Sequence, residues 1–375
     1  MKVLQVSKFY WPVMGGIETV TWELVEGMNR TGLQVGVLCS NQRPVTQRQQ
    51  FPGGYEVVRA ASLGMLLSTS MAPAMVHEMC RLSAGRDILH VHMPDPMAAL
   101  AVWAARPKAK LVVHWHSDVV KQRRAMKFYE PLQTWLLARA AAIITTSPPY
   151  GEFSGALQPW RSKVEVIPIG ISDNAGAACA DQTVQIRQRY GGRRIIFALG
   201  RMTYYKGYEV LIEAAASLPE DCVVLIGGDG ELLQQHRALI ARRGLQDKVH
   251  LLGHVPNSEL PTYYHACDVF CMPSTVRSEA YGVSMVEAMV MGKAIVASDI
   301  AGSGVPWVNV NGGTGLNTPA SQPAPMAAAL LRLLDDTTLR QRLGVASRQR
   351  YLQEFNAKLM TKRTISLYQR LLAAA

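Results

Sequence analysis

The chain has few of the features that mark secreted or membrane-spanning proteins. Its 375 residues contain no uncharged apolar run near 18 residues, and Met1–Val6 enters a strand pattern directly. Neither a transmembrane helix nor a signal peptide is therefore expected. The six cysteines are scattered and form no C-x-x-C pair, which argues against a disulfide framework or a zinc site. We expect a cytoplasmic protein.

Charged residues are also scarce, at 18% of the chain, whereas 49% of the residues are apolar. This balance excludes intrinsic disorder and supplies enough apolar side chains for sizeable cores. A chain of 375 residues exceeds the usual limit of one core, so two domains are expected. The dinucleotide fingerprint G-x-G-x-x-G is missing after the first predicted strand, which argues against a nicotinamide oxidoreductase.

Positive charge is concentrated in the first part of the chain. The formal net charge is +11, and residues 1–170 carry 18 Lys and Arg against 11 Asp and Glu. Within residues 119–139, basic residues alternate with aliphatic and aromatic ones; the basic residues are Lys121, Arg123, Arg124, Lys127 and Arg139. Such a segment fits an anionic membrane surface or a phosphorylated partner, and an ordinary surface helix is the alternative. Nucleic acid is not an expected partner.

Strand patterns alternate with helix-length segments along both halves of the chain, which predicts an α/β fold with parallel sheets. In the first half they lie at residues 3–6, 35–38, 56–59, 88–92, 110–114 and 142–145. In the second half they lie at residues 195–199, 223–226, 249–252, 268–272 and 294–297. Between 171 and 195 the sequence is rich in Ala, Gly, Asp and Gln. We therefore predict Rossmann-like domains at residues 1–172 and 173–355, with a terminal helix at 356–375.

Two pairs of histidines fall near the predicted carboxyl ends of strands, where open α/β sheets bind ligands. His90 and His92 are two residues apart, as are His114 and His116. A metal site formed by all four is a less favoured reading, because carboxylate partners at ligand spacing are lacking. We prefer His116 as a hydrogen-bonding or catalytic residue.

Two glycine-bearing loops precede predicted helices. Gly15 and Gly16 allow backbone N–H groups to approach a ligand, although a plain turn explains them equally well. In the second half, Arg201 and Lys206 lie between a strand and a helix. They fit a clamp on a diphosphate, with two solvated surface charges as the alternative. Asp229-Gly230-Glu231 is interpreted as a turn and helix cap rather than a metal site.

The stretch Ser278–Glu287 places two carboxylates, Glu279 and Glu287, on either side of Gly282, where a helix is predicted to begin. The N–H groups of a first helical turn form an anion site. Acids beside such a site favour a ligand with hydroxyls around its phosphates, as in a nucleotide sugar. Alternatively, both acids are only solvated helix residues.

The order and spacing of these elements resemble retaining family-4 glycosyltransferases with the GT-B fold. The elements are Gly15-Gly16, Arg201 with Lys206-Gly207, Gly228-Asp229-Gly230, Glu279-Ala-Tyr-Gly282 and Glu287. The stretches His116–Gln122, Arg277–Ala280 and Ser303–Asn309 are most similar to bacterial O-antigen mannosyltransferases that use GDP-mannose. Tyr281 stands where that family usually has Phe.

The resemblance implies two Rossmann-like domains facing across a cleft. The N-terminal domain would bind the acceptor, the C-terminal domain the donor, and the last helix would return to the first domain. Arg201 and Lys206 would bind the donor diphosphate, Glu287 the ribose and Glu279 the sugar, with His116 beside the transferred sugar. The remaining donor-binding residues would be Gly15, Gly16, Val255, Gly282, Val283 and Ser284.

The activity implied is transfer of a hexose, most simply mannose from GDP-mannose, to a lipid-linked or polysaccharide acceptor in O-antigen, capsule or exopolysaccharide synthesis. Neither a metal nor another cofactor is required, and the enzyme would act at the inner face of the cytoplasmic membrane. Alternatives are a rhamnosyl- or glucosyltransferase of the same kind, a GT-B epimerase, and a non-catalytic scaffold that binds sugar nucleotides.

Overall fold

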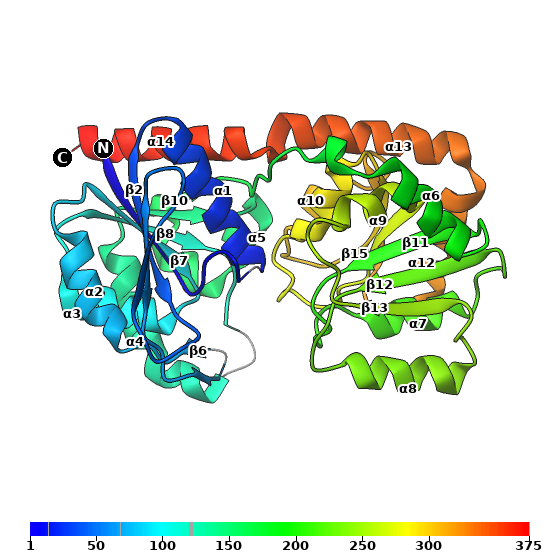
Figure 1. The fold of residues 1–375 in the computed structure, drawn as a ribbon, viewed down its shortest axis with the longest axis horizontal. Helices are drawn as coiled ribbons and strands as arrows, with labels where there is room; N and C mark the ends of the chain where they lie inside the picture. Colours follow the sequence, from blue (N-terminus) through cyan, green and yellow to red (C-terminus); the bar gives the residue numbers. More distant parts are fainter. Residues whose placement is uncertain (14, 68, 120–122, 375) are drawn as a thin grey trace. The chain divides into compact units, whose positions relative to one another are not determined.

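The computed structural model describes residues 1–13, 15–67, 69–119 and 123–374. The chain divides into two compact units (Figure 1). Unit 1 is Met1–Ser172 with Ala357–Ala375, and unit 2 is Asp173–Asn356. Each unit contains a sheet covered by helices, so the predicted α/β class is confirmed.

In the described part of unit 1, the main sheet has eight strands in the order β10-β9-β8-β7-β1-β2-β4-β3. They are β1 (Lys2–Ser7), β2 (Gln34–Ser40), β3 (Gln47–Gln50), β4 (Glu56–Ala60), β7 (Ile88–Met93), β8 (Lys110–Trp115), β9 (Ala142–Thr145) and β10 (Val164–Val166). All neighbours are parallel except β3 and β4, which are antiparallel. Strand β3 was not predicted, because its four residues are polar and exposed at the sheet edge.

Helices cover the sheet of unit 1, and a short hairpin stands apart from it. The helices are α1 (Gly16–Arg30), α2 (Ala74–Ser83), α3 (Pro96–Ala105), α4 (Arg123–Arg139), α5 (Pro148–Phe153) and α14 (Ala357–Ala373), with the 3-10 helix η1 (Gly155–Lys163). The hairpin pairs β5 (Met65–Leu66) with β6 (Thr69–Ser70).

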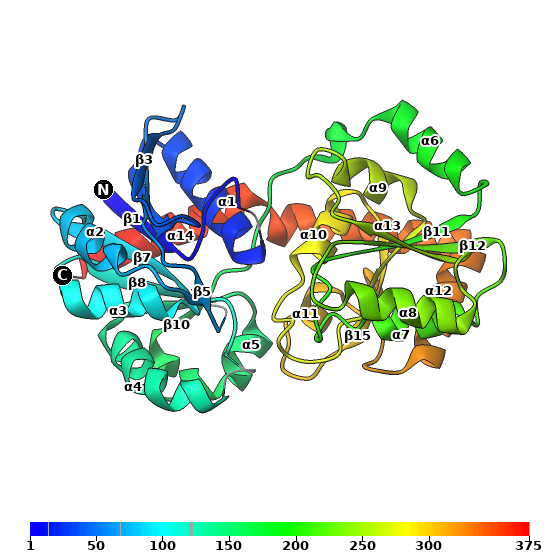
Figure 2. The same ribbon diagram turned by 60° about the horizontal axis from the view of Figure 1, so that its bottom comes forward.

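In unit 2, six described strands form a parallel sheet in the order β13-β12-β11-β14-β15-β16. They are β11 (Arg194–Leu199), β12 (Cys222–Gly227), β13 (Val249–Gly253), β14 (Val269–Met272), β15 (Ala294–Asp299) and β16 (Gly315–Pro319). The helices are α6 (Ala180–Arg189), α7 (Tyr208–Ala215), α8 (Leu233–Arg243), α9 (Leu260–Ala266), α10 (Val283–Val290), α11 (Val305–Val308), α12 (Pro323–Asp335) and α13 (Thr337–Arg350), with the short helices η2 (Ala175–Ala177) and η3 (Tyr351–Phe355). Figure 2 shows α7 and α8 on one face of this sheet and α9 on the other.

Both sheets are doubly wound, and each reverses its strand order once. In unit 1 the order reverses between β1 and β7, and in unit 2 between β11 and β14. Loops at the carboxyl ends of the strands diverge at such a switch point, and open α/β sheets bind ligands there. The topology therefore predicts that ligand-binding residues lie in the loops after β11 and β14, and in those after β1, β7 and β8.

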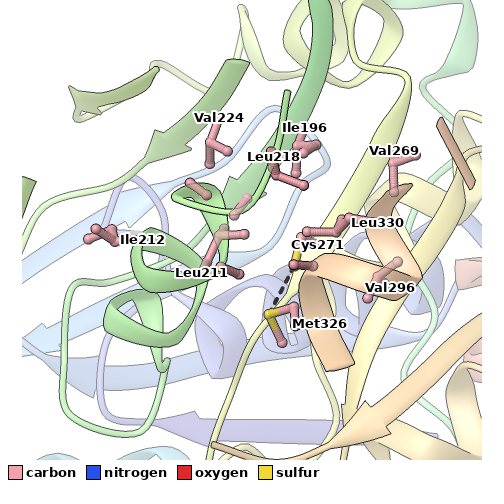
Figure 3. Close-up of a cluster of buried hydrophobic side chains, with 14 of the residues drawn as sticks. Ile196, Leu211, Ile212, Leu218, Val224, Val269, Cys271, Val296, Met326 and Leu330 are labelled. Atoms are coloured by element: carbon pink, nitrogen blue, oxygen red, sulfur yellow. Dashed lines mark hydrogen bonds between the residues drawn. The ribbon is translucent and has the colours of Figure 1, made fainter. Parts of the chain in front are cut away.

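A continuous apolar core fixes the strands and helices of unit 2 (Figure 3). Ile196, Val224 and Val269 come from neighbouring strands, and Leu211 and Leu330 come from helices on the same face; all are almost completely buried. Burying side chains of this size stabilises the fold by about 1.5–3 kcal/mol each. The switch-point loops are therefore carried by a rigid sheet.

The C-terminal helix α14 packs against α1 within unit 1. Gly27 of α1 allows the approach, because a Cβ atom there would lie 2.2 Å from Thr361 Oγ1. Tyr368 of α14 is fully buried. The terminal helix thus supplies core residues to unit 1, although the 184 residues of unit 2 (Asp173–Asn356) separate it in the sequence from the rest of unit 1.

The basic segment at residues 119–139 is described only in part. Lys121 and Gln122 lie outside the described residues, whereas Arg123–Arg139 forms α4. Phe128 is 89% exposed, and Lys127 beside it is exposed too. Among the helices that the structure describes, none has the length and apolar character needed to cross a membrane.

Candidate active site

Two loops meet at the switch point of unit 2, one after β11 and one after β14. The backbone N–H of Thr275 donates to the carbonyl of Tyr205 at 2.9 Å, and the hydroxyls of Tyr204 and Ser278 are 2.9 Å apart. Gly207 permits this contact, because its φ is +66° and a Cβ there would lie 2.1 Å from the carbonyl oxygen of Pro273. The loops therefore form one ordered surface.

A nearly buried ion pair joins these loops. Lys206 Nζ lies 2.6 Å from Glu279 Oε2, and the two side chains expose only 13% and 9% of their area. Ser274 donates a second hydrogen bond to Glu279 Oε2 at 3.0 Å. Burial lowers the pKa of Lys206, but the charge of Glu279 and the hydrogen bond to it outweigh this effect, so the net pKa is raised. The ammonium therefore stays charged at neutral pH.

The backbone around Glu279 is fixed by the loop after β15. Ser303 Oγ donates to the carbonyl of Glu279, and the N–H of Gly304 donates to the carbonyl of Ala280 at 2.9 Å. These bonds aim the Glu279 side chain at Lys206 rather than at solvent.

The N-terminus of α10 opens at the same edge of the sheet. Its N-cap residue, Gly282, has a φ of +90°, and no side chain caps the helix. Ser284 Oγ in the first turn is buried and lacks a hydrogen-bond partner among the described residues. Uncapped N–H groups at a helix start carry a partial positive charge and bind anions. The predicted anion-binding role of Gly282, Val283 and Ser284 stays a prediction.

Glu287 lies one turn further along α10 and is held by a residue that the sequence did not single out. Tyr264 of α9 donates to Glu287 Oε2 at 2.6 Å, with the carbonyl of Ser284 2.9 Å from the same hydroxyl. Burial raises the pKa of Glu287, and the Tyr264 hydrogen bond and the charge of Lys206 oppose that shift. The second carboxylate is therefore electrostatically linked to Lys206.

The other predicted donor residues of unit 2 flank this centre. Arg201 is exposed in the loop after β11, and its charge acts on Lys206. Val255 is buried after β13, and its Cγ2 is 3.1 Å from where a Cβ of Gly227 would be. The donor roles of Arg201, Lys206, Val255, Glu279 and Glu287 stay predictions.

Asp229-Gly230-Glu231 forms a turn, as expected, but it does not cap the following helix. Asp229 Oδ1 accepts the N–H of Gly230 at 2.7 Å, whereas α8 has Leu232 at its N-cap and no side-chain cap. The segment is instead bonded to the loop after β11: Met202 N donates to the backbone carbonyl of Asp229 at 2.8 Å, and Thr203 Oγ1 donates to Glu231 Oε1 at 3.3 Å. The helix-cap part of the interpretation is therefore wrong.

In unit 1 the four histidines of β7 and β8 form a buried stack. His90 and His92 are parallel at 4.7 Å between ring centroids, and His114 and His116 at 4.1 Å. Residues two apart on a strand share a face, and His92 pairs with His114 across the two strands. Burial lowers the pKa of His116 to about 3 and holds the pKa values of the other three well below their usual range. All four rings are neutral at physiological pH.

A chain of hydrogen bonds connects His116 to the terminal helix. Gln5 Nε2 donates to Tyr368 Oη at 3.2 Å, and Tyr368 contacts His90 Nδ1. Gln5 Oε1 accepts from His92 Nε2 at 2.9 Å, so His92 Nδ1 is the acceptor for His116 Nε2 at 2.9 Å. This order of donors and acceptors leaves His116 Nδ1 as a lone pair at the carboxyl end of β8. Its predicted place beside the transferred sugar stays a prediction.

Three of the stacked histidines lie close enough to share a metal ion. One nitrogen each of His90, His92 and His114 lies within 4.8 Å of the others. In the described residues, His90 Nε2 and both nitrogens of His114 have no hydrogen-bond partner, but the two nitrogens of His92 are bonded to Gln5 and His116. A metal bound by His92 would have to break that chain, so the stack is better described as a buried group of neutral histidines.

The loop between β1 and α1 contains the last predicted positions. Gly15 is the extended N-cap of α1 and lacks a side-chain cap bond, and Gly16 is the first helical residue. A Cβ on Gly15 would lie 2.6 Å from Glu18 Oε2. Both glycines are exposed, so their backbone can be approached from solvent.

The fold and these loops define a protein of the doubly wound α/β class, in which ligands bind at the switch points. Comparison with known proteins specifies the class further. The family profile described as "Glycosyl transferases group 1" matches residues 181–350, and "Glycosyl transferase 4-like domain" matches residues 15–170.

Two bacterial relatives are similar over nearly their whole length. D-rhamnosyltransferase WbpZ of Pseudomonas aeruginosa is 32% identical over 95% of this chain and 93% of its own. O-antigen chain mannosyltransferase C of Escherichia coli is 30% identical over 99% of both chains.

Among solved structures, sucrose-phosphate synthase from Thermosynechococcus elongatus has a TM-score of 0.86 at 22% identity, with 100% of both chains covered. Anabaena HepE in complex with UDP-glucose has a TM-score of 0.78 at 20% identity, over 99% of this chain and 100% of its own. The chain belongs to the family-4 glycosyltransferases, which are retaining enzymes with the GT-B fold.

The buried ion pair generates a stability prediction. Lys206→Met leaves Glu279 without its counter-charge and should lower the free energy of unfolding by about 3–5 kcal/mol. The double variant Lys206→Met/Glu279→Gln removes both charges and should recover most of the loss. The pKa of Lys206 is raised above its ordinary value of 10.5, so the ammonium group stays charged at any pH below that value. The loss of stability in Lys206→Met should therefore be constant from about pH 6 to about pH 9.

Urea denaturation of the two variants and of Glu279→Gln measures the coupling. A double variant no more stable than Lys206→Met would show that the pair does not exist in solution.

The neutral histidine stack predicts acid sensitivity. The unfolded chain binds protons near the ordinary histidine pKa of 6.5, whereas the folded stack does not, so stability should fall as the pH drops below about 6.5. Each histidine should contribute about 1.4 kcal/mol per pH unit. His114→Leu should remove the contribution of one histidine to this pH dependence. It also removes a buried ring whose two nitrogens have no hydrogen-bond partner among the described residues.

The free energy of unfolding, measured between about pH 5 and about pH 8, tests this. The control is His77→Gln, which changes an exposed histidine. Equal pH slopes for His114→Leu and the control would contradict the neutral assignment.

Proposed function

We propose that this glycosyltransferase transfers a hexose, with its anomeric configuration retained, from a nucleoside-diphosphate sugar to a lipid-linked glycan of bacterial O-antigen or a related polysaccharide. Mannose from GDP-mannose is the leading donor, and rhamnose or glucose are the alternatives. The two relatives named as a rhamnosyltransferase and an O-antigen mannosyltransferase support the substrate class, and the UDP-glucose complex of HepE supports a sugar nucleotide.

The observation that carries the proposal is the Lys206–Glu279 pair beside the open start of α10. A diphosphate brings several negative charges, which Lys206, Arg201 and the N–H groups of Val283 and Ser284 would share. Lys206 would then exchange its carboxylate partner for phosphate oxygen. Glu279, released from the pair, would accept hydrogen bonds from the sugar hydroxyls, and Glu287 would accept those of the ribose.

The reaction needs charge stabilisation more than an enzymic nucleophile. The bond between the sugar C1 and the β-phosphate oxygen breaks, and the acceptor hydroxyl oxygen bonds to C1 on the same face. The proton of that hydroxyl passes to the departing phosphate. Lys206 and Arg201 would stabilise the charge that develops on this phosphate, a type of contribution typically worth about 3–4 kcal/mol. His116 would accept a hydrogen bond from the sugar through Nδ1.

A transfer assay tests the proposal. The wild-type protein with GDP-mannose and a polyprenyl-diphosphate-linked sugar should lengthen the acceptor, with parallel reactions for nucleotide-linked rhamnose and for UDP-glucose. Glu279→Gln should reduce turnover at least about 100-fold, because it weakens contacts to the reacting sugar. Glu152→Gln, an exposed change in unit 1, is the matched control. Activity should survive EDTA.

Three results would contradict the proposal. Donor converted without acceptor indicates an epimerase, and nucleotide binding without turnover of any donor indicates a scaffold. Full turnover of Glu279→Gln would remove the role assigned to that carboxylate.

A further inference from the structure

The hairpin after β4 presents large apolar side chains to solvent. Leu63 is 79% exposed, Met65 53%, Leu66 58% and Leu67 61%, and Met71 at the end of the hairpin is 39% exposed. Single exposed apolar residues are ordinary on protein surfaces, but clusters of them mark interaction sites. All five residues of this cluster lie close together in the sequence.

The sequence around the hairpin carries no formal charge. From Ala60 to His77 there is no Lys, Arg, Asp or Glu, although edges and hairpins of soluble proteins are usually protected by charged side chains. Leu67 adopts a φ of +48°, a left-handed conformation that costs free energy for any residue with a Cβ and favours glycine or asparagine. Leu67 thus places a large apolar side chain in a backbone conformation that is unfavourable for it.

The base of the hairpin is ordered, so the exposure is not a consequence of a frayed loop. Leu63 N donates to the carbonyl of Met71 at 2.8 Å, and Met71 N donates to that of Gly64 at 2.9 Å. Below them the buried hydroxyls of Ser62 and Ser70 are 2.9 Å apart. The polar atoms face the protein and the apolar side chains face outward.

The net charge of the chain is confined to the unit that carries this hairpin. Unit 1 contains 22 Lys and Arg against 11 Asp and Glu, whereas unit 2 contains 17 of each, so unit 1 accounts for the whole formal charge of +11. A surplus of this sign attracts anionic surfaces over several ångströms.

We propose that the exposed apolar side chains Leu63, Met65, Leu66 and Leu67 insert into the interface of an anionic phospholipid bilayer, and that the positive charge of unit 1 helps to hold them there. Stable but reversible membrane binding requires two such signals, one apolar and one electrostatic. A protein partner fits less well, because the tip lacks the aromatic and Arg side chains and hydrogen-bonding groups typical of specific protein interfaces. The proposal goes beyond the transfer reaction and does not depend on the donor.

Vesicle flotation of the full-length protein tests the docking. Vesicles of phosphatidylcholine with about 30% phosphatidylglycerol should bind the wild type, and phosphatidylcholine alone should bind it at least about tenfold more weakly. Leu63→Ser/Leu66→Ser should lower the affinity for the anionic vesicles by at least about tenfold, because both side chains insert. The matched control, Val184→Ser/Val345→Ser, removes two side chains of unit 2 that are 53% and 59% exposed, and should bind like the wild type.

Two further measurements separate this proposal from its rivals. The mass in solution, from light scattering, should be the same for the wild type and the hairpin variant; a smaller mass for the variant would show that the hairpin joins copies of the chain and would overturn the proposal. Transfer to a water-soluble acceptor analogue should be equal in both, so a failure of docking is distinguishable from a failure of the proposed reaction. Equal vesicle binding by the hairpin variant and the control would also overturn it.

Discussion

The buried pair of Lys206 and Glu279 is the interaction on which the candidate site depends. Two opposite charges at 2.6 Å, each almost withdrawn from water, are stable only when both are present. The pair keeps a cation beside the uncapped start of α10. If the proposed diphosphate took the place of the carboxylate at Lys206, Glu279 would need new hydrogen bonds, which the sugar hydroxyls of the proposed donor would donate.

The surrounding structure serves to keep that pair aligned. Gly207 lets the β11 loop approach Pro273, and the loop after β15 fixes the backbone of Glu279 through Ser303. Unit 1 uses a different device, a row of neutral histidines that gives His116 a defined hydrogen-bonding state from within the core. The candidate site of unit 2 thus contains a charged pair, whereas the corresponding strands of unit 1 contain neutral hydrogen-bonded side chains.

Much of this architecture could be predicted from the sequence, because buried parallel strands give long apolar runs and helices follow them at regular spacing. The carboxylates at 279 and 287 were found because they flank Gly282, a local pattern. The hydrogen bonds of Tyr264 and Ser303 to this site were not predicted, since they join segments that only the folded sheet brings together. The polar edge strand Gln47–Gln50 was missed for a related reason: its pairing with β4 leaves no apolar pattern.

The central claim is that the loops after β11 and β14 bind the diphosphate of a sugar nucleotide. Calorimetric titration of GDP, UDP and dTDP into the wild type and into Lys206→Met/Glu279→Gln tests it most directly, because the double variant is expected to be folded. We expect one of the three nucleotides to bind the wild type, and the double variant to bind it about 100-fold more weakly, a loss of about 2.7 kcal/mol. Unchanged affinity in the double variant would show that these loops do not hold the diphosphate.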